Sequence, residues 1–175
     1  EGASFALDGS GSTDPNSDPL TYAWDLDNDG AYDDATGVGP TTSFADNGTY
    51  PIGLEVSDSL LTNTATATVT VNDLAPTAAI SGPATLDEGQ SGAFSGSAST
   101  SFPDAIVQYE WDLDNDGIYD DATGMTISHS FSDNGVYTIG LRVTDDDGST
   151  DTANFTVTVN DLAPTAVLSG PASLN

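Results

Sequence analysis

The strongest constraint on this chain is an internal repeat. The stretch YAWDLDNDGAYDDATG at 22–37 returns as YEWDLDNDGIYDDATG at 109–124, an offset of 87 residues. SFADNGTYPIGLEVSD at 43–58 returns at 130–145 with the same offset, and VTVNDLAPTA at 69–78 returns at 157–166 with an offset of 88. Two copies of one unit therefore follow each other, and each copy must fold within a little under 90 residues.

Apolar residues alternate with polar ones at period two, which indicates β-strands with one buried face. The strand around each Trp places these residues inward: Leu20, Tyr22, Trp24 and Leu26, then Val107, Tyr109, Trp111 and Leu113 in the second copy. Two later strands place these inward: Tyr50, Ile52, Leu54, Val56, Ala65, Ala67, Val69 and Val71, mirrored by Tyr137, Ile139, Leu141, Val143, Ala153, Phe155, Val157 and Val159. On the same pattern, Asp25 and Asp112 face outward. Short strands at regular spacing predict an all-β fold of tandem immunoglobulin-like sandwiches, with about seven strands per domain.

The charge balance narrows the range of ligands. The chain has 28 acidic residues against one basic residue, Arg142, and a net charge of −27. Nucleic acid and anionic membrane surfaces are excluded as favoured partners, because binding them requires Lys and Arg. Hard divalent cations are favoured instead. The regular alternation and the 6 Phe, 6 Tyr and 2 Trp argue against a disordered acidic chain.

A ten-residue acidic stretch occurs once in each copy, as DLDNDGAYDD at 25–34 and DLDNDGIYDD at 112–121. Carboxylates at positions 1, 3 and 5, Gly at 6, a carbonyl at 7 and an acid at 9 suit Ca²⁺. The predicted ligands are Asp25, Asp27, Asp29, the Ala31 carbonyl, Asp33 and Asp34, and in the second copy Asp112, Asp114, Asp116, the Ile118 carbonyl, Asp120 and Asp121. Position 12 holds Thr36 or Thr123 in place of a bidentate Glu, so weak binding, roughly 10⁻⁴–10⁻³ M, is expected.

The alternative interpretation of these stretches is a pair of solvated acidic loops in which some side chains cap turns. Five carboxylates within ten residues repel one another, and no Lys or Arg stands nearby to compensate them. Solvation is the favoured interpretation for two other acidic groups, Asp14 with Asp18, and the run at 145–147. For Asp14 and Asp18, the alternative interpretation is a calcium ion that one of them shares with the stretch 71–73.

The order of these motifs is similar to that of the PKD (polycystic kidney disease) repeat. YxWDLDNDG, then SFxDNGxYxIGLxVxD, then TVTVND follow each other in both copies, and the resemblance covers the whole chain. It departs from the family pattern in Leu-Asp-Asn-Asp-Gly after the Trp. The resemblance implies an extracellular β-sandwich of a large prokaryotic protein, with a structural or adhesive role, and does not itself imply a metal site.

The repeat also predicts domain boundaries. We expect residues 1–73 to form a PKD-like domain lacking its first strand and residues 74–161 to form a complete one. APTAVLSGPASL at 163–174 has the form of APTAAISGPATL at 75–86, so 162–175 is expected to be the first strand of a next repeat or a donor strand for a neighbouring unit. Copies would then join head-to-tail through 162–175 and the open edge of 1–73.

Catalysis is not expected. His129 is the sole His, no nucleophile motif accompanies it, and small sandwiches rarely carry a substrate cleft. The predicted function is a structural segment of a calcium-stiffened extracellular array or filament, such as a surface fibre, sheath or giant adhesin. The alternative is a polysaccharide- or protein-binding accessory module of a secreted enzyme, which predicts exposed aromatic residues on one sheet face.

Overall fold

The computed structural model describes residues 1–170, and the regular structure in this range consists only of β-strands. These residues form two compact units. The first unit comprises residues 1–75, 101–105 and 145–149, and the second comprises the remaining described residues from 76 onward. The prediction of an all-β fold of tandem sandwiches is confirmed.

None of the described residues belongs to a helix that could span a membrane.

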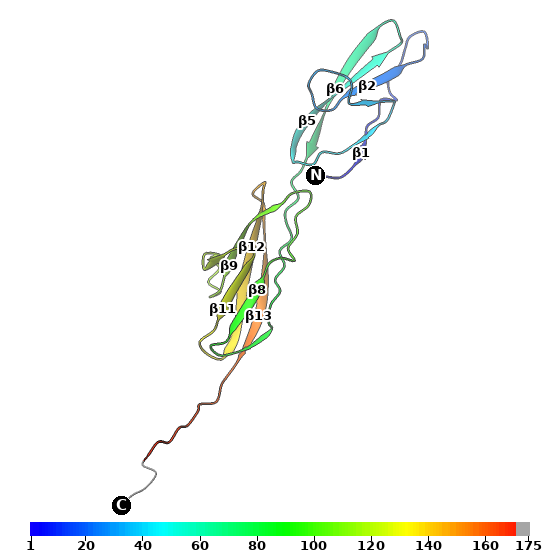
Figure 1. Cartoon of the computed structure of the whole chain (residues 1–175). Coiled ribbons are helices and arrows are strands. Elements are labelled where there is room, and N and C mark those ends of the chain that lie inside the picture. The colour runs from blue at the N-terminus through cyan, green and yellow to red at the C-terminus, as the bar shows by residue number, and fades with distance from the viewer. Residues whose placement is uncertain (171–175) are drawn as a thin grey trace, which may run out of the picture. The chain divides into compact units, whose positions relative to one another are not determined.

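The second unit is a sandwich of two sheets (Figure 1). Its larger sheet has the strand order β10-β9-β12-β13-β7. The bounds are β7 (Thr85–Asp87), β9 (Ile106–Asp112), β10 (Ala122–Thr123), β12 (Gly135–Asp145) and β13 (Thr150–Asn160). The smaller sheet pairs β8 (Ser91–Ser95) with β11 (Thr126–Ser130). The neighbours are antiparallel in every pairing given for this unit except that of β13 with β7, which is parallel.

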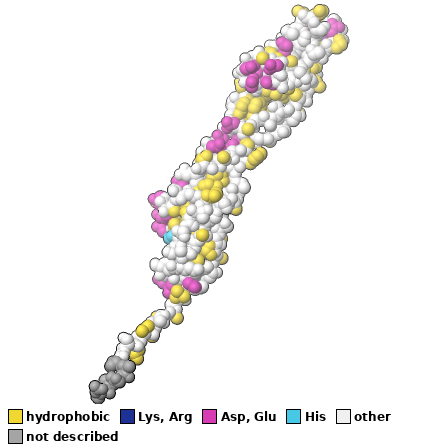
Figure 2. Space-filling view, in the orientation of Figure 1, with side chains coloured by type: hydrophobic (Ala, Val, Ile, Leu, Met, Phe, Trp, Pro, Cys, Tyr) yellow, Lys and Arg dark blue, Asp and Glu magenta, His cyan; other side chains and the backbone are white. Residues whose placement is uncertain are grey.

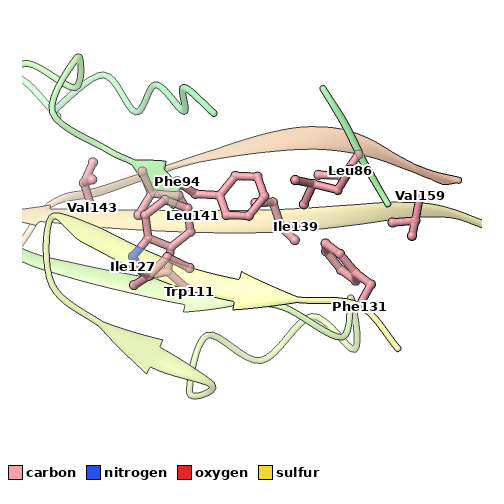
Figure 3. Packing of buried hydrophobic residues seen from close by; sticks show 10 residues of the cluster. Leu86, Phe94, Trp111, Ile127, Phe131, Ile139, Leu141, Val143 and Val159 are labelled. Atoms are coloured by element: carbon pink, nitrogen blue, oxygen red, sulfur yellow. The ribbon is translucent and has the colours of Figure 1, made fainter. Parts of the chain in front are cut away.

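Both sheets supply the core of the second unit. Phe94 of β8 and Ile127 of β11 pack against residues of β9, β12 and β13, and Figure 3 shows Phe94 and Ile127 gathered around Trp111 and Leu141. Complete burial (0% exposed) is found for Phe94, Trp111, Ile139, Leu141, Val143 and Val157. At the other end of the core, Leu86 lies beside Val159 and Phe131 (Figure 3).

The first unit repeats this plan with fewer strands. A four-stranded sheet has the order β3-β2-β5-β6, and a two-stranded sheet pairs β1 with β4. The bounds are β1 (Phe5–Ala6), β2 (Thr21–Asp25), β3 (Ala35–Thr36), β4 (Thr41–Thr42), β5 (Gly48–Ser57) and β6 (Thr62–Val71). Trp24 and Ile52 are buried at 5% and 2% exposure, whereas Leu54 and Val56 are only half-buried.

The last strand of each unit differs in its surroundings. In the second unit, β13 lies between β12 and β7, and its inner residues Val157 and Val159 are buried. In the first unit, β6 is the end strand of its sheet, and no described strand pairs with its outer side. Ala65 and Ala67, which the alternation predicts to lie inward, are exposed, and Ala65 lines an open groove.

Two further expectations about faces are wrong. Val107 is 62% exposed, because the preceding residue, Ile106, takes the contact with the core at the start of β9. Asp25 and Asp112 are buried at 5% and 4% exposure, although the alternation places them on the solvent face. The loop that follows each strand folds back over its last residue, which explains the burial of both carboxylates.

Candidate metal centres

The two acidic stretches form loops that begin where β2 and β9 end. Asp25 and Asp112 are the last residues of these strands. Each loop then passes through a left-handed Asn, with φ of 58° at Asn28 and 60° at Asn115, followed by a Gly with φ of about 90°. Asn and Gly are the residues that accept this backbone with least strain. Both sequences therefore fold into the same tight loop.

Asp34 and Asp121 close these loops. Asp34 Oδ2 accepts hydrogen bonds from Leu26 N at 2.6 Å and Asp27 N at 3.2 Å. Asp121 Oδ2 accepts the equivalent pair, from Leu113 N at 2.6 Å and Asp114 N at 3.2 Å. The amide of each closing residue donates to the carbonyl of the core Trp, at 3.1 Å in both units. The ends of each loop are thus held together by hydrogen bonds to the protein itself.

Within each loop, three carboxylates converge. Asp25, Asp27 and Asp29 each offer an oxygen within 4.8 Å of the others, and so do Asp112, Asp114 and Asp121 in the second unit. Such a group of hard oxygen donors is suited to Ca²⁺, which takes 6–8 oxygen ligands at roughly 2.3–2.6 Å. The remaining ligands at an exposed loop would be carbonyl oxygens and water.

The buried carboxylate differs between the two loops. Asp25 Oδ2 accepts a hydrogen bond from Gly30 N at 3.1 Å, while its Oδ1 is buried without a donor among the described residues. In the second loop both oxygens of Asp112 are used, by Gly117 N at 3.0 Å and Asp116 N at 3.2 Å. A buried carboxylate oxygen without a donor is costly. A cation in the first loop would supply the missing partner.

Carboxylate repulsion is visible in the second loop. Burial raises the pKa of Asp114, and the nearby charges of Asp116, Asp121 and Asp112 raise it further, against a hydrogen bond from the Asp116 amide that lowers it. The Asp114 carboxyl is therefore harder to ionise than a solitary one, and a divalent cation would relieve that cost.

The predicted ligands are not all equivalent in the structure. The convergent groups contain neither Asp33 nor Asp34 in the first loop, and neither Asp116 nor Asp120 in the second. Asp29 and Asp116 each accept a hydrogen bond from the amide two residues on, at 2.8 Å from Ala31 N and 2.7 Å from Ile118 N. Ligation by the carbonyls of Ala31 and Ile118 stays a prediction.

Aromatic side chains support both loops. A Cβ atom on Gly53 would lie 2.9 Å from the Tyr32 ring and 3.2 Å from the Asp25 Cβ, so Gly53 allows Tyr32 to pack beside the buried carboxylate. Gly140 plays the same part for Tyr119. Trp24 and Trp111 are core residues, and each indole N–H donates to a carbonyl at 2.9 Å, that of Gly37 or Gly124.

The single Arg of the chain, Arg142, forms an ion pair with Glu110. Arg142 binds Glu110 Oε2 through Nε at 2.8 Å and through a terminal nitrogen at 2.6 Å. Its guanidinium carbon also lies 5.2 Å from the centre of the Tyr119 ring. It offers no hydrogen bond to the loop carboxylates in the described structure, so the loop charges have no cationic partner of their own.

A further acidic group, in the first unit, was not found by sequence reasoning. Glu1, Asp73, Asp104 and Asp147 offer oxygens within 4.8 Å of one another. A hydrogen bond to the Glu1 side chain, together with burial and repulsion from neighbouring acids, raises the pKa of Asp104 to about 6. The four residues come from distant parts of the sequence, so no local motif could have indicated the group.

The structure does not bring Asp14 or Asp18 together with the stretch 71–73, as a calcium ion shared between them would require. Asp14 Oδ1 accepts hydrogen bonds from the amides of Asn16 at 2.9 Å and Asp18 at 3.0 Å, and so closes its own turn. Asp73 lies instead with the group that contains Asp147.

The space-filling view shows acidic side chains gathered in separate patches with largely uncharged surface between them (Figure 2). In the second unit, His129 lies beside such a patch, and a hollow of about 530 Å³ is lined there by Asp114, Asp121, His129 and Tyr137 together with Leu113 and Phe131.

The fold and the loops define a class: tandem immunoglobulin-like β-sandwich modules, each with an acidic loop after its Trp strand. The sequence matches the PKD domain family over residues 1–72 and again over residues 73–159. The chain therefore belongs to the PKD domain family.

Solved structures similar to this chain include two PKD domains from Vibrio. The PKD1 domain of Vibrio anguillarum Epp is 30% identical, covers 52% of this chain and 100% of its own, and gives a TM-score of 0.43. The PKD1 domain of the Vibrio cholerae metalloprotease PrtV is 31% identical, covers 50% and 99%, and gives 0.42. A structure described among the carbohydrate-binding modules of the β-sandwich superfamily is 24% identical over 52% of this chain and 36% of its own, with a TM-score of 0.45.

Proposed function

We propose that this chain is a structural segment of an extracellular array of PKD domains that calcium stiffens, as in a surface fibre, sheath or giant adhesin. The observation that carries the proposal is the acidic loop, which recurs in both units with the same backbone, the same closing carboxylate and a buried Asp at its base. A function in which the domains serve as repeated mechanical elements requires a feature of this kind in every copy. No catalytic role is proposed.

Calcium would act on the loop rather than on the core. Asp25, Asp27 and Asp29 would hold an ion in the first unit, and Asp112 and Asp114 with Asp121 in the second. The ion supplies positive charge and oxygen coordination, which lowers the repulsion among these acids and fixes the loop against its strand. Two ions would neutralise four of the 27 net negative charges, so the surface would remain strongly acidic.

The array would be formed by copies of the repeat that follow one another head-to-tail through 162–175 and the open edge of 1–73. Residues 171–175 lie outside the described residues, and 162–170 are exposed and belong to no strand. An extracellular setting would supply free calcium at concentrations high enough to fill weak sites.

Thermal unfolding of the 1–175 chain tests the calcium part of the proposal. The midpoint is expected to rise when EDTA is replaced by 10 mM CaCl₂, and to rise less with 10 mM MgCl₂, because Mg²⁺ gives up its water reluctantly. Sodium chloride at matched ionic strength controls for charge screening. A midpoint that calcium leaves unchanged, or that sodium raises equally, would contradict it.

A second candidate function is glycan binding by an accessory module. The observation that favours it is the hollow of about 530 Å³ in the second unit, which is lined by the half-buried Tyr137 ring together with the Asp114 and Asp121 carboxylates. Aromatic rings with nearby polar groups are common in carbohydrate sites. Binding of the chain on a glycan array, lost in Tyr137→Ala, would favour this function over a purely structural one.

A further inference from the structure

In the second unit, residues 77–81 form an extended segment that lies along β8 and its continuation. Thr77 and Thr100 exchange two backbone hydrogen bonds, at 2.7 and 2.9 Å, and Ser81 and Ser95 exchange two more, at 2.9 and 2.8 Å. Between these pairs, Ala78 N donates to Asp151 Oδ2 at 2.8 Å. This segment is therefore held at both ends and in the middle.

The side chains of this segment cover the core. Ala78 and Ile80 pack against the cluster that contains Leu141 and Val143, and both of those residues are completely buried. Ser99 adds a side-chain anchor, because its Oγ accepts from Ala79 N at 2.9 Å and donates to Ala79 O at 3.2 Å.

The first unit has an open groove at the equivalent place. Its volume is about 510 Å³, and its walls include Leu54 and Val56 from β5 and Ala65 from β6. Leu54 and Val56 correspond to Leu141 and Val143 at the offset of 87, yet they are only half-buried. The groove thus exposes apolar surface that its counterpart in the second unit covers with Ala78 and Ile80.

The groove also carries the polar anchors of a strand site. Ser12 and Thr13 correspond to Ser99 and Thr100 at the offset of 87, and Asn63 corresponds to Asp151 at the offset of 88. All three line the groove. The side chains of Ser12 and Asn63 take part in none of the hydrogen bonds found within the described part of the chain.

We infer that this groove is the seat of residues 163–170 of a second copy of the chain, bound as an extended strand. These residues, APTAVLSG, match APTAAISG at 75–82, so Ala166 and Leu168 take the places of Ala78 and Ile80. In the register of the second unit, Thr165 pairs with Thr13 and Ser169 with Asp8. The inference rests on the proposed head-to-tail array and supplies its contact.

Three observations favour this occupant. Val167 and Leu168 are 85% and 100% exposed in the described structure, so an apolar stretch lies unpartnered in solvent there. Residues 163–170 carry no charge, so they add no repulsion when they dock on a chain of net charge −27. Finally, the segment 76–82, which 163–170 matches, packs within the unit that follows it in sequence rather than the one that precedes it.

Sedimentation velocity on the 1–175 chain tests the inference, with matched variants of the tail. The wild-type chain is expected to associate as its concentration rises. Leu168→Asp, on the groove face, should weaken the association constant roughly tenfold to hundredfold, the cost of no longer burying a Leu side chain. Val167→Asp adds the same charge one residue away on the opposite face and should have a much smaller effect. Because both positions are exposed, neither change disturbs the fold of the free chain.

Two further proteins test the groove itself. Ala65→Glu alters the groove wall and leaves the tail intact, and it should weaken association as Leu168→Asp does. A fusion that places the sequence of 163–175 before Glu1 should fill the groove within one chain, which gives a monomer with a higher melting midpoint. A wild-type chain that stays monomeric, a fusion that is no more stable, or equal effects of Leu168→Asp and Val167→Asp would overturn the inference.

Each measurement is made in EDTA and in 10 mM CaCl₂, so that the two proposals can fail separately. Association that persists in EDTA and depends on Leu168 supports the strand contact even where calcium has no effect on melting. A calcium-dependent melting shift in a chain that never associates supports the metal sites and overturns the strand contact.

Discussion

The first acidic loop should bind calcium more tightly than the second. In the first loop, Asp25 Oδ1 has no donor among the described residues and is free to ligate. In the second loop, Asp112 Oδ1 accepts a hydrogen bond from Asp116 N at 3.2 Å, which an ion at that oxygen would displace or weaken. A net hydrogen bond is worth about 0.5–1.5 kcal/mol, so the second loop is expected to bind roughly 2- to 12-fold more weakly.

Removing one buried carboxylate at a time measures this difference. Asp25→Asn keeps the shape of the side chain and an acceptor for Gly30 N, but it removes a charge from the ion. Asp112→Asn makes the same change in the second loop. Titration calorimetry should show two classes of site in the wild-type chain, the tighter class missing from Asp25→Asn and the weaker class missing from Asp112→Asn. Asp161→Asn, an exposed acid outside both loops, controls for the loss of one charge.

The expected effect on stability follows from the affinity. For dissociation constants of roughly 10⁻⁴–10⁻³ M, 10 mM calcium stabilises the unit that binds it by about 1.4–2.7 kcal/mol. For a domain of this size that is a rise of about 6 to 20 °C in melting midpoint. Loss of the tighter class in Asp112→Asn, or retention of both classes in Asp25→Asn, would refute the reasoning from the unpartnered oxygen.

Three further predictions concern stability. Without metal, the first unit should become more stable as pH falls from 7 to 5, because the pKa of Asp104 is raised from 3.8 to about 6 in the folded state and the folded chain therefore takes up a proton first. Thermal melts across this pH range should show the trend, and Asp104→Asn should flatten it. Leu141→Ala should cost about 2–5 kcal/mol in chemical denaturation, whereas Leu54→Ala should cost less, since Leu54 already faces an open groove; equal costs would contradict the difference in burial. Trp111→Phe should lower the free energy of unfolding by about 1–3 kcal/mol, because it leaves the Gly124 carbonyl without its donor and leaves a space in place of the indole; Trp24→Phe should cost a similar amount. Denaturant midpoints for the two variants would show whether both units depend on this hydrogen bond.

The repeat and the period-two pattern were sufficient to predict the fold class, because both are local properties of the sequence. The burial of Trp24, Trp111, Ile52 and Ile139 follows from alternation alone. Alternation fails at Asp25 and Asp112, where burial is set by the loop that folds back on the strand end rather than by the pleat of the strand. It fails again at Val107, because a period does not say where along a strand the core begins.

The acidic motif predicted where carboxylates gather, but it did not predict which of them close the loop and which converge on one point. Spacing gave Asp34 and Asp121 the same role, and in the structure each does spend one oxygen on two backbone amides, but only Asp121 also belongs to a convergent group. The group of Glu1, Asp73, Asp104 and Asp147 depends on contacts between residues far apart in sequence, so a motif search has no access to it.

The ends of each loop are joined to the Trp strand by hydrogen bonds, and this decides what calcium can change. The Trp before the last residue of the strand accepts a hydrogen bond from the amide of the closing Asp through its carbonyl, and its indole donates to the carbonyl of a Gly just beyond the loop. The loop ends are therefore fixed by the folded sheet whether or not an ion is present, while the segment between them carries the repelling acids. Removing calcium should free residues 27–33 and 114–120 to exchange amide hydrogens faster and leave the β5 and β12 amides protected. On this view the ion does not make the sandwich fold. It stiffens a loop that the sandwich already holds at both ends.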